Sequence, residues 1–253
     1  MCLLVLAWQA HRRYRLVLAA NRDEFHARPT AALAHWQDSP PITGGRDLKS
    51  GGTWLAVSGA RFGALTNFSE RQSSPPASPS RGELIPGFLS DERTPQAYAD
   101  TLESRAGRYC GFSLLLGDER SLTYASNRAQ PFARTLTPGV YGLSNHLLDT
   151  PWPKLARVRR ALQDWLAADA RGGAGALLAA LADRTPAQAS QLPATARGGE
   201  WDRVLSSPFV QHPEYGTRSS TVLTLGHDGH GEIVERRYDA TGALTGETAL
   251  ALS

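Results

Sequence analysis

The sequence has few cysteines, lacks common metal-binding patterns and contains no long apolar run. Its two cysteines, Cys2 and Cys110, are far apart in the chain and do not indicate a disulfide framework. It has no C-x-x-C or H-E-x-x-H pattern, so no metal site is predicted. No apolar run approaches the ~20 residues of a membrane span, and the N-terminal run lacks the positive region of a signal peptide. We therefore expect a cytoplasmic protein without an integral membrane segment.

Basic residues are numerous but dispersed. The 253 residues include 25 arginines, 2 lysines and 24 acidic residues, which gives a net charge of +3. The densest basic cluster, 11–15, is interpreted as a solvated turn between two strands. Without a basic block, no nucleic-acid partner is expected. The length and the 41% hydrophobic content are typical of one large domain, which we predict to cover residues 1–253. The oligomeric state is not indicated.

Strand-like and helix-like patterns occur in groups and do not alternate regularly. The expected hairpins pair 3–8 with 14–20 and 53–58 with 61–66, and further strands are expected at 112–116, 122–126, 140–143, 220–225, 232–237 and 248–252. Helices are expected at 82–89, 94–106, 153–170 and 175–182, and glycine-rich turns at 44–47 and 51–52. The missing β-α-β alternation argues against a doubly wound parallel sheet and favours an α+β fold with antiparallel sheets between helices.

The N-terminal hairpin brings chemically active groups together. Its first strand begins beside Cys2, and its second ends in Asn21-Arg22-Asp23-Glu24, so these groups are expected at one edge of a sheet. If Met1 is removed, Cys2 carries both a thiol and an α-amine whose pKa of about 8 suits a base at neutral pH. Asp23 is a candidate for orienting that amine. A small buried cysteine beside a solvated acidic turn explains the same residues equally well.

Two asparagines also follow strand-like runs. Asn67 ends the second hairpin, and its side chain is expected to reach the same sheet edge as Asp23. Asn145 follows the strand expected at 140–143. A side-chain amide at either position is suited to donating a hydrogen bond to an oxyanion, although asparagine is also a common turn residue.

Several motifs together resemble one known family. They are Ala19-Ala20-Asn21-Arg22-Asp23-Glu24-Phe25, Arg28-Pro29, Gly51-Gly52-Thr53-Trp54-Leu55, Ala64-Leu65-Thr66-Asn67, Arg81-Gly82-Glu83-Leu84 and Ser144-Asn145-His146. This set resembles the NRDE family, also called the transport and Golgi organisation 2 family. The family is similar in pattern to N-terminal-nucleophile hydrolases of the choloylglycine hydrolase and penicillin acylase branch. The resemblance implies a single NRDE-type domain with a four-layer αββα sandwich of two antiparallel sheets between helices.

The resemblance also implies roles for individual residues. Cys2 is the expected nucleophile and Asp23 the partner of its amine. Asn67 and Asn145 are the expected oxyanion donors, and Arg218 the group that lowers the thiol pKa. Asn21 and Arg22 are expected to contact substrate. One position departs from the pattern, because choloylglycine hydrolases carry an arginine where this chain has Ala20, and Arg22 lies between Asn21 and Asp23.

Two functions remain open at this point. The first is an N-terminal-cysteine amidohydrolase or acyltransferase that acts on the C–N bond of an amide or on an acyl thioester, with no required cofactor. The second is a non-enzymatic carrier that binds and traffics haem or an acyl-CoA or lipid on the same scaffold, since a fold does not fix its function. Both imply a small-molecule ligand or substrate. The complete set of residues favours the enzyme, and the Arg22 departure favours the carrier.

Overall fold

In the computed structural model, the chain folds into two compact units, each built around one antiparallel sheet. The structure describes residues 2–37, 41–70, 78–192 and 200–253. Unit 1 comprises the residues up to Ala27 together with Pro138–Ser144 and Asp149–Ser253. Unit 2 comprises Arg28–Thr137 and Asn145–Leu148. The α+β class with two antiparallel sheets is therefore confirmed.

The sheet of unit 1 has six strands in the order β10-β1-β2-β11-β12-β13. The bounds are β1 Cys2–Trp8, β2 Tyr14–Phe25, β10 Gly139–Leu143, β11 Tyr215–Gly226, β12 Gly231–Tyr238 and β13 Leu244–Leu252. The expected N-terminal hairpin is confirmed as β1 and β2, and both strands are buried along almost their entire length. Such burial explains why their sequences are nearly continuous apolar runs.

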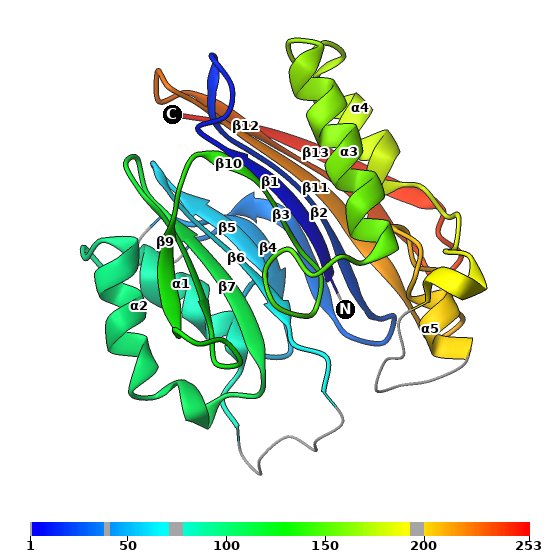
Figure 1. Ribbon diagram of the computed structural model, residues 1–253, viewed down its shortest axis with the longest axis horizontal. Helices are drawn as coiled ribbons and strands as arrows, with labels where there is room; N and C mark the ends of the chain where they lie inside the picture. Colours follow the sequence, from blue (N-terminus) through cyan, green and yellow to red (C-terminus); the bar gives the residue numbers. More distant parts are fainter. Residues whose placement is uncertain (1, 38–40, 71–77, 193–199) are drawn as a thin grey trace. The chain divides into compact units, whose positions relative to one another are not determined.

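Two helices of unit 1, α3 (Pro153–Ala167) and α4 (Gly173–Leu181), cover one face of this sheet (Figure 1). The apolar core between them combines Leu3, Val5, Ala7, Val17, Ala19, Val222 and Val234 of the sheet with Leu155, Val158, Leu162, Trp165, Leu177, Leu178 and Leu181 of the helices. This packing fixes the first turn of α3 near the start of β1. A shorter helix, α5 (Glu200–Val204), precedes β11.

The sheet of unit 2 has seven strands in the order β3 to β9. Their bounds are β3 Thr30–His35, β4 Thr43–Asp47, β5 Leu55–Ser58, β6 Arg61–Asn67, β7 Phe112–Gly117, β8 Leu122–Ser126 and β9 Ala133–Leu136. Helices α1 (Leu84–Leu89) and α2 (Pro95–Glu103) pack on it through a core that includes Ile85, Phe88, Tyr98, Leu102, Phe112, Leu114 and Leu116. Short 3-10 turns occur at Arg81–Glu83, Ala106–Arg108 and Ala189–Gln191.

Local signals in the sequence account for much of this structure. The helix expected to begin near residue 94 is α2, with the Thr94 side chain accepting a hydrogen bond from the Ala97 N–H and Pro95 in the first turn. The turn expected at 44–47 is wrong, because these residues belong to β4. A Cβ atom on Gly44 would lie 2.7 Å from the Leu55 carbonyl oxygen, so this glycine allows β4 to approach β5 closely.

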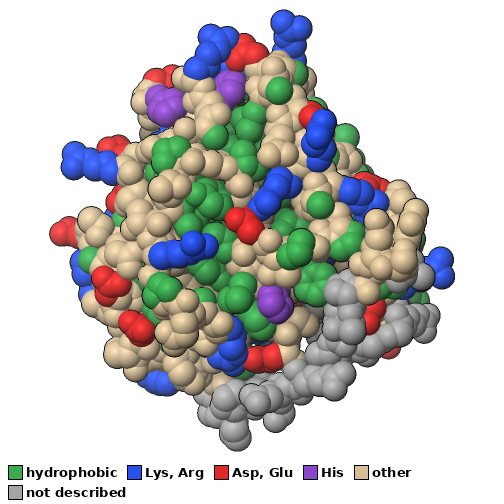
Figure 2. All heavy atoms as spheres, in the orientation of Figure 1, with side chains coloured by type: hydrophobic (Ala, Val, Ile, Leu, Met, Phe, Trp, Pro, Cys, Tyr) green, Lys and Arg blue, Asp and Glu red, His purple; other side chains and the backbone are tan. Residues whose placement is uncertain are grey.

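The distribution of basic side chains on the surface and the length of the helices relate to the expected absence of nucleic-acid and membrane partners. Figure 2 shows the Lys and Arg side chains on one face scattered among acidic and neutral residues and not gathered into one patch. Within the described ranges, no helix is long and apolar enough to cross a membrane. The expected cytoplasmic location stays a prediction.

Candidate active site

The register of the first hairpin places Cys2 beside the end of β2. Cys2 lies opposite Arg22, and Leu3 lies opposite Asn21. The Cys2 backbone is held from the other side, because the Ser144 hydroxyl donates a 3.1 Å hydrogen bond to the Cys2 carbonyl. Cys2 is half-buried, whereas Arg22 and Asp23 are only 4% and 2% exposed. The expected proximity of Cys2 to the Asn21–Asp23 group is confirmed.

Asp23 is held by a chain of hydrogen bonds from β11. The Thr217 hydroxyl donates a 2.7 Å hydrogen bond to Asp23 Oδ1 and accepts one of 2.9 Å from the Val210 N–H. The Tyr215 hydroxyl donates to the Asp23 carbonyl at 2.8 Å. Burial raises the pKa of the Asp23 carboxyl, while the Lys154 ammonium, the Thr217 hydrogen bond and the Arg22 guanidinium act in the opposite direction. These contacts fix the carboxyl group in place and offset part of the effect of burial, which still leaves the Asp23 pKa above its ordinary value.

The side chain of Asn21 anchors β2 to neighbouring segments through hydrogen bonds. Its Nδ2 donates to the carbonyls of Leu181 at 2.8 Å and Pro208 at 2.9 Å. Its Oδ1 accepts a 2.6 Å hydrogen bond from the Ser220 hydroxyl. Both amide hydrogens are thus bonded inside the protein, and the residue is 1% exposed. These bonds tie β2 to the end of α4 and to the segment before β11, and the expected substrate contact of Asn21 stays a prediction.

Lys154 belongs to the same region, although lysine is a residue type typical of a solvated helix face. It is the second residue of α3 and is 4% exposed. Burial lowers the pKa of its ammonium group, and the negative charges of Asp23 and Cys2 oppose that shift. The signal for its burial was present, because Lys154 and Val158 are separated by one helical turn and lie on the same helix face.

The thiol of Cys2 has a pKa above its ordinary value. Burial is the largest cause, and the nearby Asp23 charge acts in the same direction. A hydrogen bond from the Asp23 backbone and the positive charge of Arg22 oppose the shift. The net change is opposite to the lowering expected from Arg218, because desolvation of the thiolate outweighs the nearby positive charge.

Arg218 lies in a β-bulge of β11. In the pairing with β2, Thr217 is opposite Asp23 and Ser219 is opposite Arg22, which leaves Arg218 as the extra residue. Its guanidinium donates to the carbonyls of Phe25 at 3.1 Å and His26 at 3.0 Å. These bonds hold the Arg218 side chain against the chain that leaves β2. A catalytic role for Arg218 stays a prediction.

Asn67 and Asn145 both belong to unit 2, where they lie together. Asn145 Nδ2 donates a 2.8 Å hydrogen bond to the Asn67 carbonyl, and Asn145 adopts a left-handed backbone with φ 54°. The second hairpin that ends at Asn67 lies in the seven-stranded sheet, so the expectation that it shares a sheet edge with Asp23 is wrong. Alternation along a strand indicates which faces are buried but not which sheet the strand joins. The oxyanion role of the two asparagines stays a prediction.

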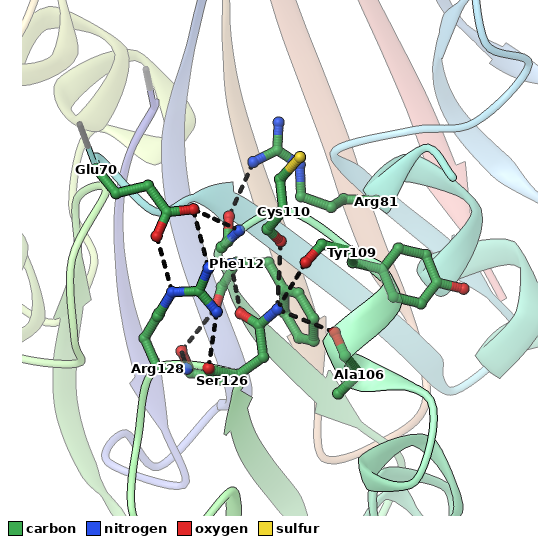
Figure 3. Close-up of polar contacts among 10 residues, drawn as sticks. Glu70, Arg81, Ala106, Tyr109, Cys110, Phe112, Ser126 and Arg128 are labelled. Carbon is green, nitrogen blue, oxygen red and sulfur yellow. Dashed lines mark hydrogen bonds and ion pairs between the residues drawn. The ribbon is translucent and has the colours of Figure 1, made fainter. Parts of the chain in front are cut away.

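Cys110 lies in a polar cluster of unit 2 (Figure 3). It is a free, half-buried thiol. Its carbonyl accepts a 3.3 Å hydrogen bond from Asn127 Nδ2. Beside it, Arg128 donates to both carboxylate oxygens of Glu70 at 2.8 and 3.0 Å, and the Gly111 N–H donates to the same carboxylate at 3.0 Å. These contacts organise the loop before β7.

Comparisons with known proteins identify relatives over most of the chain. The family model described as "Transport and Golgi organisation 2" matches residues 1–240. The human "Transport and Golgi organization protein 2 homolog" is 36% identical over 239 residues, which cover 88% of this chain and 86% of the human protein. "Transport and Golgi organization protein 2" of Drosophila melanogaster is 26% identical over 243 residues, with the same coverage of 88% and 86%. A solved structure of the "Caenorhabditis elegans N-acylethanolamine-hydrolyzing acid amidase (NAAA) ortholog" matches with a TM-score of 0.44 and 14% identity, covering 88% of this chain and 92% of that one.

Proposed function

The chain belongs to the Transport and Golgi organisation 2 family, and we propose that it is an N-terminal-cysteine amidohydrolase or acyltransferase acting on an amide or an acyl thioester. Cys2, as the first residue after removal of Met1, is the nucleophile. The observation that carries the proposal is the position of Cys2 at the start of β1, next to the buried Asp23 carboxyl that Thr217 holds at 2.7 Å. A structural cysteine has no need of such a fixed acidic partner.

The reaction follows from the groups on Cys2. Its α-amine takes the thiol proton, and the sulfur attacks the carbonyl carbon of the substrate to form a tetrahedral oxyanion. When that intermediate collapses, the C–N or C–S bond breaks, and the leaving amine or thiol takes the proton. The acyl group is then a thioester on Cys2. Water releases it as a carboxylic acid, or an acceptor amine or thiol takes it. Asp23 orients the α-amine and stabilises its positive charge.

Mass spectrometry tests the first requirement. We expect the intact mass of the purified protein to correspond to a chain that begins at Cys2. A fully retained Met1 would exclude the α-amine as the base, because the amine would then be part of a peptide bond.

A panel of substrates tests the chemical step. Acyl-amides and acyl-CoA esters are incubated with wild type, Cys2→Ala and the matched control Cys110→Ala. We expect turnover by wild type and Cys110→Ala, an acyl adduct on Cys2, and no turnover by Cys2→Ala with ligand affinity nearly unchanged. The reason is that the nucleophile acts in the covalent step, whereas most binding comes from the pocket.

One observation favours the second candidate function, a carrier of haem or of an acyl-CoA or lipid. Burial raises the pKa of the Cys2 thiol, so the neutral form predominates at neutral pH, and a neutral thiol is a poor nucleophile. The same panel, extended with haem, separates the two functions. Saturable binding without turnover or a covalent adduct would replace the enzyme with the carrier. Loss of haem binding in Cys2→Ala would identify the thiol as an iron ligand.

A further inference from the structure

Lysine is rare in this chain, and its two copies have opposite environments. The sequence has 25 arginines and only two lysines, Lys49 and Lys154. Lys49 is exposed, whereas Lys154 is buried in the first turn of α3. The second lysine therefore occupies a site that must accommodate an ammonium group without bulk water.

The position of Lys154 is unfavourable for a cation in three respects. Burial removes its hydration, and the N-terminal turn of a helix carries partial positive charge that repels it. Among the described residues, Lys154 Nζ has no hydrogen-bond partner. A buried cation is normally retained only with a compensating negative charge nearby. Leu155, the next residue along α3, shares one apolar core with Leu3, the neighbour of Cys2 in β1, so the first turn of α3 lies near the start of β1. The negative groups that act on Lys154 there are Asp23 and Cys2.

Several ionisable groups in this region act on one another. They are Cys2 of β1, Arg22 and Asp23 of β2, Lys154 of α3 and the α-amino group of the chain. Arg22, Lys154 and the α-amino group carry positive charge when protonated, so one carboxylate at Asp23 does not compensate all of them. Ionisation of Cys2 supplies a second negative charge. The guanidinium of Arg218, on the neighbouring β11, donates to the Phe25 and His26 carbonyls.

We propose that Lys154 is a positioning residue of the Cys2 site, whose ammonium group keeps the Asp23 carboxylate ionised and stabilises negative charge on the Cys2 sulfur. The functional meaning of this role rests on the proposed function, in which Cys2 is the nucleophile. The close packing of Leu155 holds Lys154 over the sheet, because a Cβ atom on Gly142 of β10 would lie 2.7 Å from Leu155 Cδ1. The first turn of α3 is thus fixed beside the sheet before any substrate binds.

The pH dependence of thiol alkylation tests the proposal without any substrate. In a Cys110→Ala background, Cys2 is the only thiol. Its alkylation rate is measured against pH in three proteins of this background: one that retains Lys154, one with Lys154→Met and one with Lys154→Arg. We expect Lys154→Met to move the midpoint upward by about one pH unit, the size of shift that one nearby opposite charge produces. Lys154→Arg should retain much of the wild-type profile, because it keeps the charge. Lys49→Met is the matched control and should leave the profile unchanged.

The proposal would be overturned if the alkylation rates of Cys2 had the same pH dependence in the protein with Lys154 and in Lys154→Met, with the fold retained in circular dichroism. If Lys154→Met does not fold, a reciprocal measurement decides. Isotope-labelled lysine gives only two side-chain amine signals, and Lys49→Arg assigns them. We expect Lys154 to lose its proton at lower pH in Cys2→Ala than in wild type, because coupling between two titrating groups is mutual. An unchanged Lys154 titration would overturn the proposal.

These measurements also separate this proposal from the proposed function. Absence of turnover across the substrate panel with a shifted alkylation profile would reject the enzyme and retain the electrostatic role of Lys154. Turnover by wild type with an unshifted profile would retain the enzyme and remove Lys154 from its site.

Discussion

Gly142 of β10 lies so close to Leu155 of α3 that a Cβ atom on the glycine would stand 2.7 Å from Leu155 Cδ1 and 2.9 Å from Leu155 Cγ. Leu155 is buried in the core of unit 1 and directly follows Lys154. The absence of a side chain at residue 142 therefore determines how near the first turn of α3 comes to the sheet that carries Cys2.

Gly142→Ala is expected to destabilise the protein by about 1–2 kcal/mol, because an added methyl group in a packed core forces neighbouring atoms to move. Urea unfolding measures the change. Gly139→Ala on the same strand is the matched control. There the added Cβ atom would meet the Tyr141 ring at 3.4 Å, an ordinary contact, so little change is expected. Equal losses for both variants would contradict the importance of the Gly142–Leu155 contact.

Alkylation of Cys2 should be slow near neutral pH. The folded state raises the Cys2 pKa above the reference value of 9.0, so the folded protein holds the thiol proton more tightly than the unfolded chain does. In Cys110→Ala, we expect the rate to rise about tenfold per pH unit below the thiol pKa, since only the thiolate reacts. The urea-unfolded protein should react faster at the same pH. Faster reaction of the folded protein would indicate a lowered pKa.

The raised pKa of Cys2 also predicts how the free energy of unfolding changes with pH. Between the Cys2 pKa of the unfolded state and that of the folded state, the folded protein binds more protons than the unfolded chain. The contribution of Cys2 to the free energy of unfolding is therefore fully present below the unfolded-state pKa. It is lost as the pH rises through the folded-state pKa. The free energy of unfolding of wild type should therefore fall relative to Cys2→Ala as the pH rises above about 9. Parallel curves for the two proteins would contradict this.

Asn21 should matter for stability. Asn21→Leu removes its hydrogen bonds to the Leu181 and Pro208 carbonyls and leaves the Ser220 hydroxyl without its acceptor, so we expect a loss of about 2–4 kcal/mol in urea unfolding. Ser220→Ala removes one of these bonds and is expected to cost about 1 kcal/mol. A loss of ligand affinity in Asn21→Leu at full stability would instead support its predicted contact with substrate.

The contribution of Glu70 to stability should be lost in a window below pH 4.5. The hydrogen bonds from Arg128 and the Gly111 N–H lower the Glu70 pKa from 4.5 in the folded state. Its contribution is therefore present above the unfolded value and is lost as pH falls through the folded one. We expect the difference in unfolding free energy between wild type and Glu70→Gln to shrink across that window. A constant difference would mean that the Glu70–Arg128 pair does not titrate with folding.

The sequence predicted those features that depend on neighbouring residues. The β1–β2 hairpin follows from two apolar runs joined by a short polar turn, and its register brings Cys2 to Arg22. The start of α2 follows from Thr94 and Pro95. In both cases the residues that specify the structure lie within or next to it, so the local sequence is sufficient to predict it.

Features that depend on distant partners escaped prediction. Glycines of β4 look like turn residues until the close approach of Leu55 is known. The strands β3 and β9, six and four residues long, lack a clear alternating apolar pattern. The grouping of Lys154 with Asp23 and Cys2 was not predicted, because these two residues are more than a hundred positions away from it in the chain.

The extra residue in β11 has a consequence for chain length. Thr217 and Ser220 are three positions apart, yet they bond to Asp23 and Asn21, two side chains on the same face of β2. A regular strand would direct residues three apart to opposite faces. The extra residue of the bulge at Arg218 brings Thr217 and Ser220 onto the same face. Shortening the chain by Arg218 alone would leave a continuous ladder with both contacts aligned. Insertions or deletions of one residue between Ser219 and Leu225 would send every following side chain to the wrong face, so within this stretch of the strand a change in length is tolerated at residue 218.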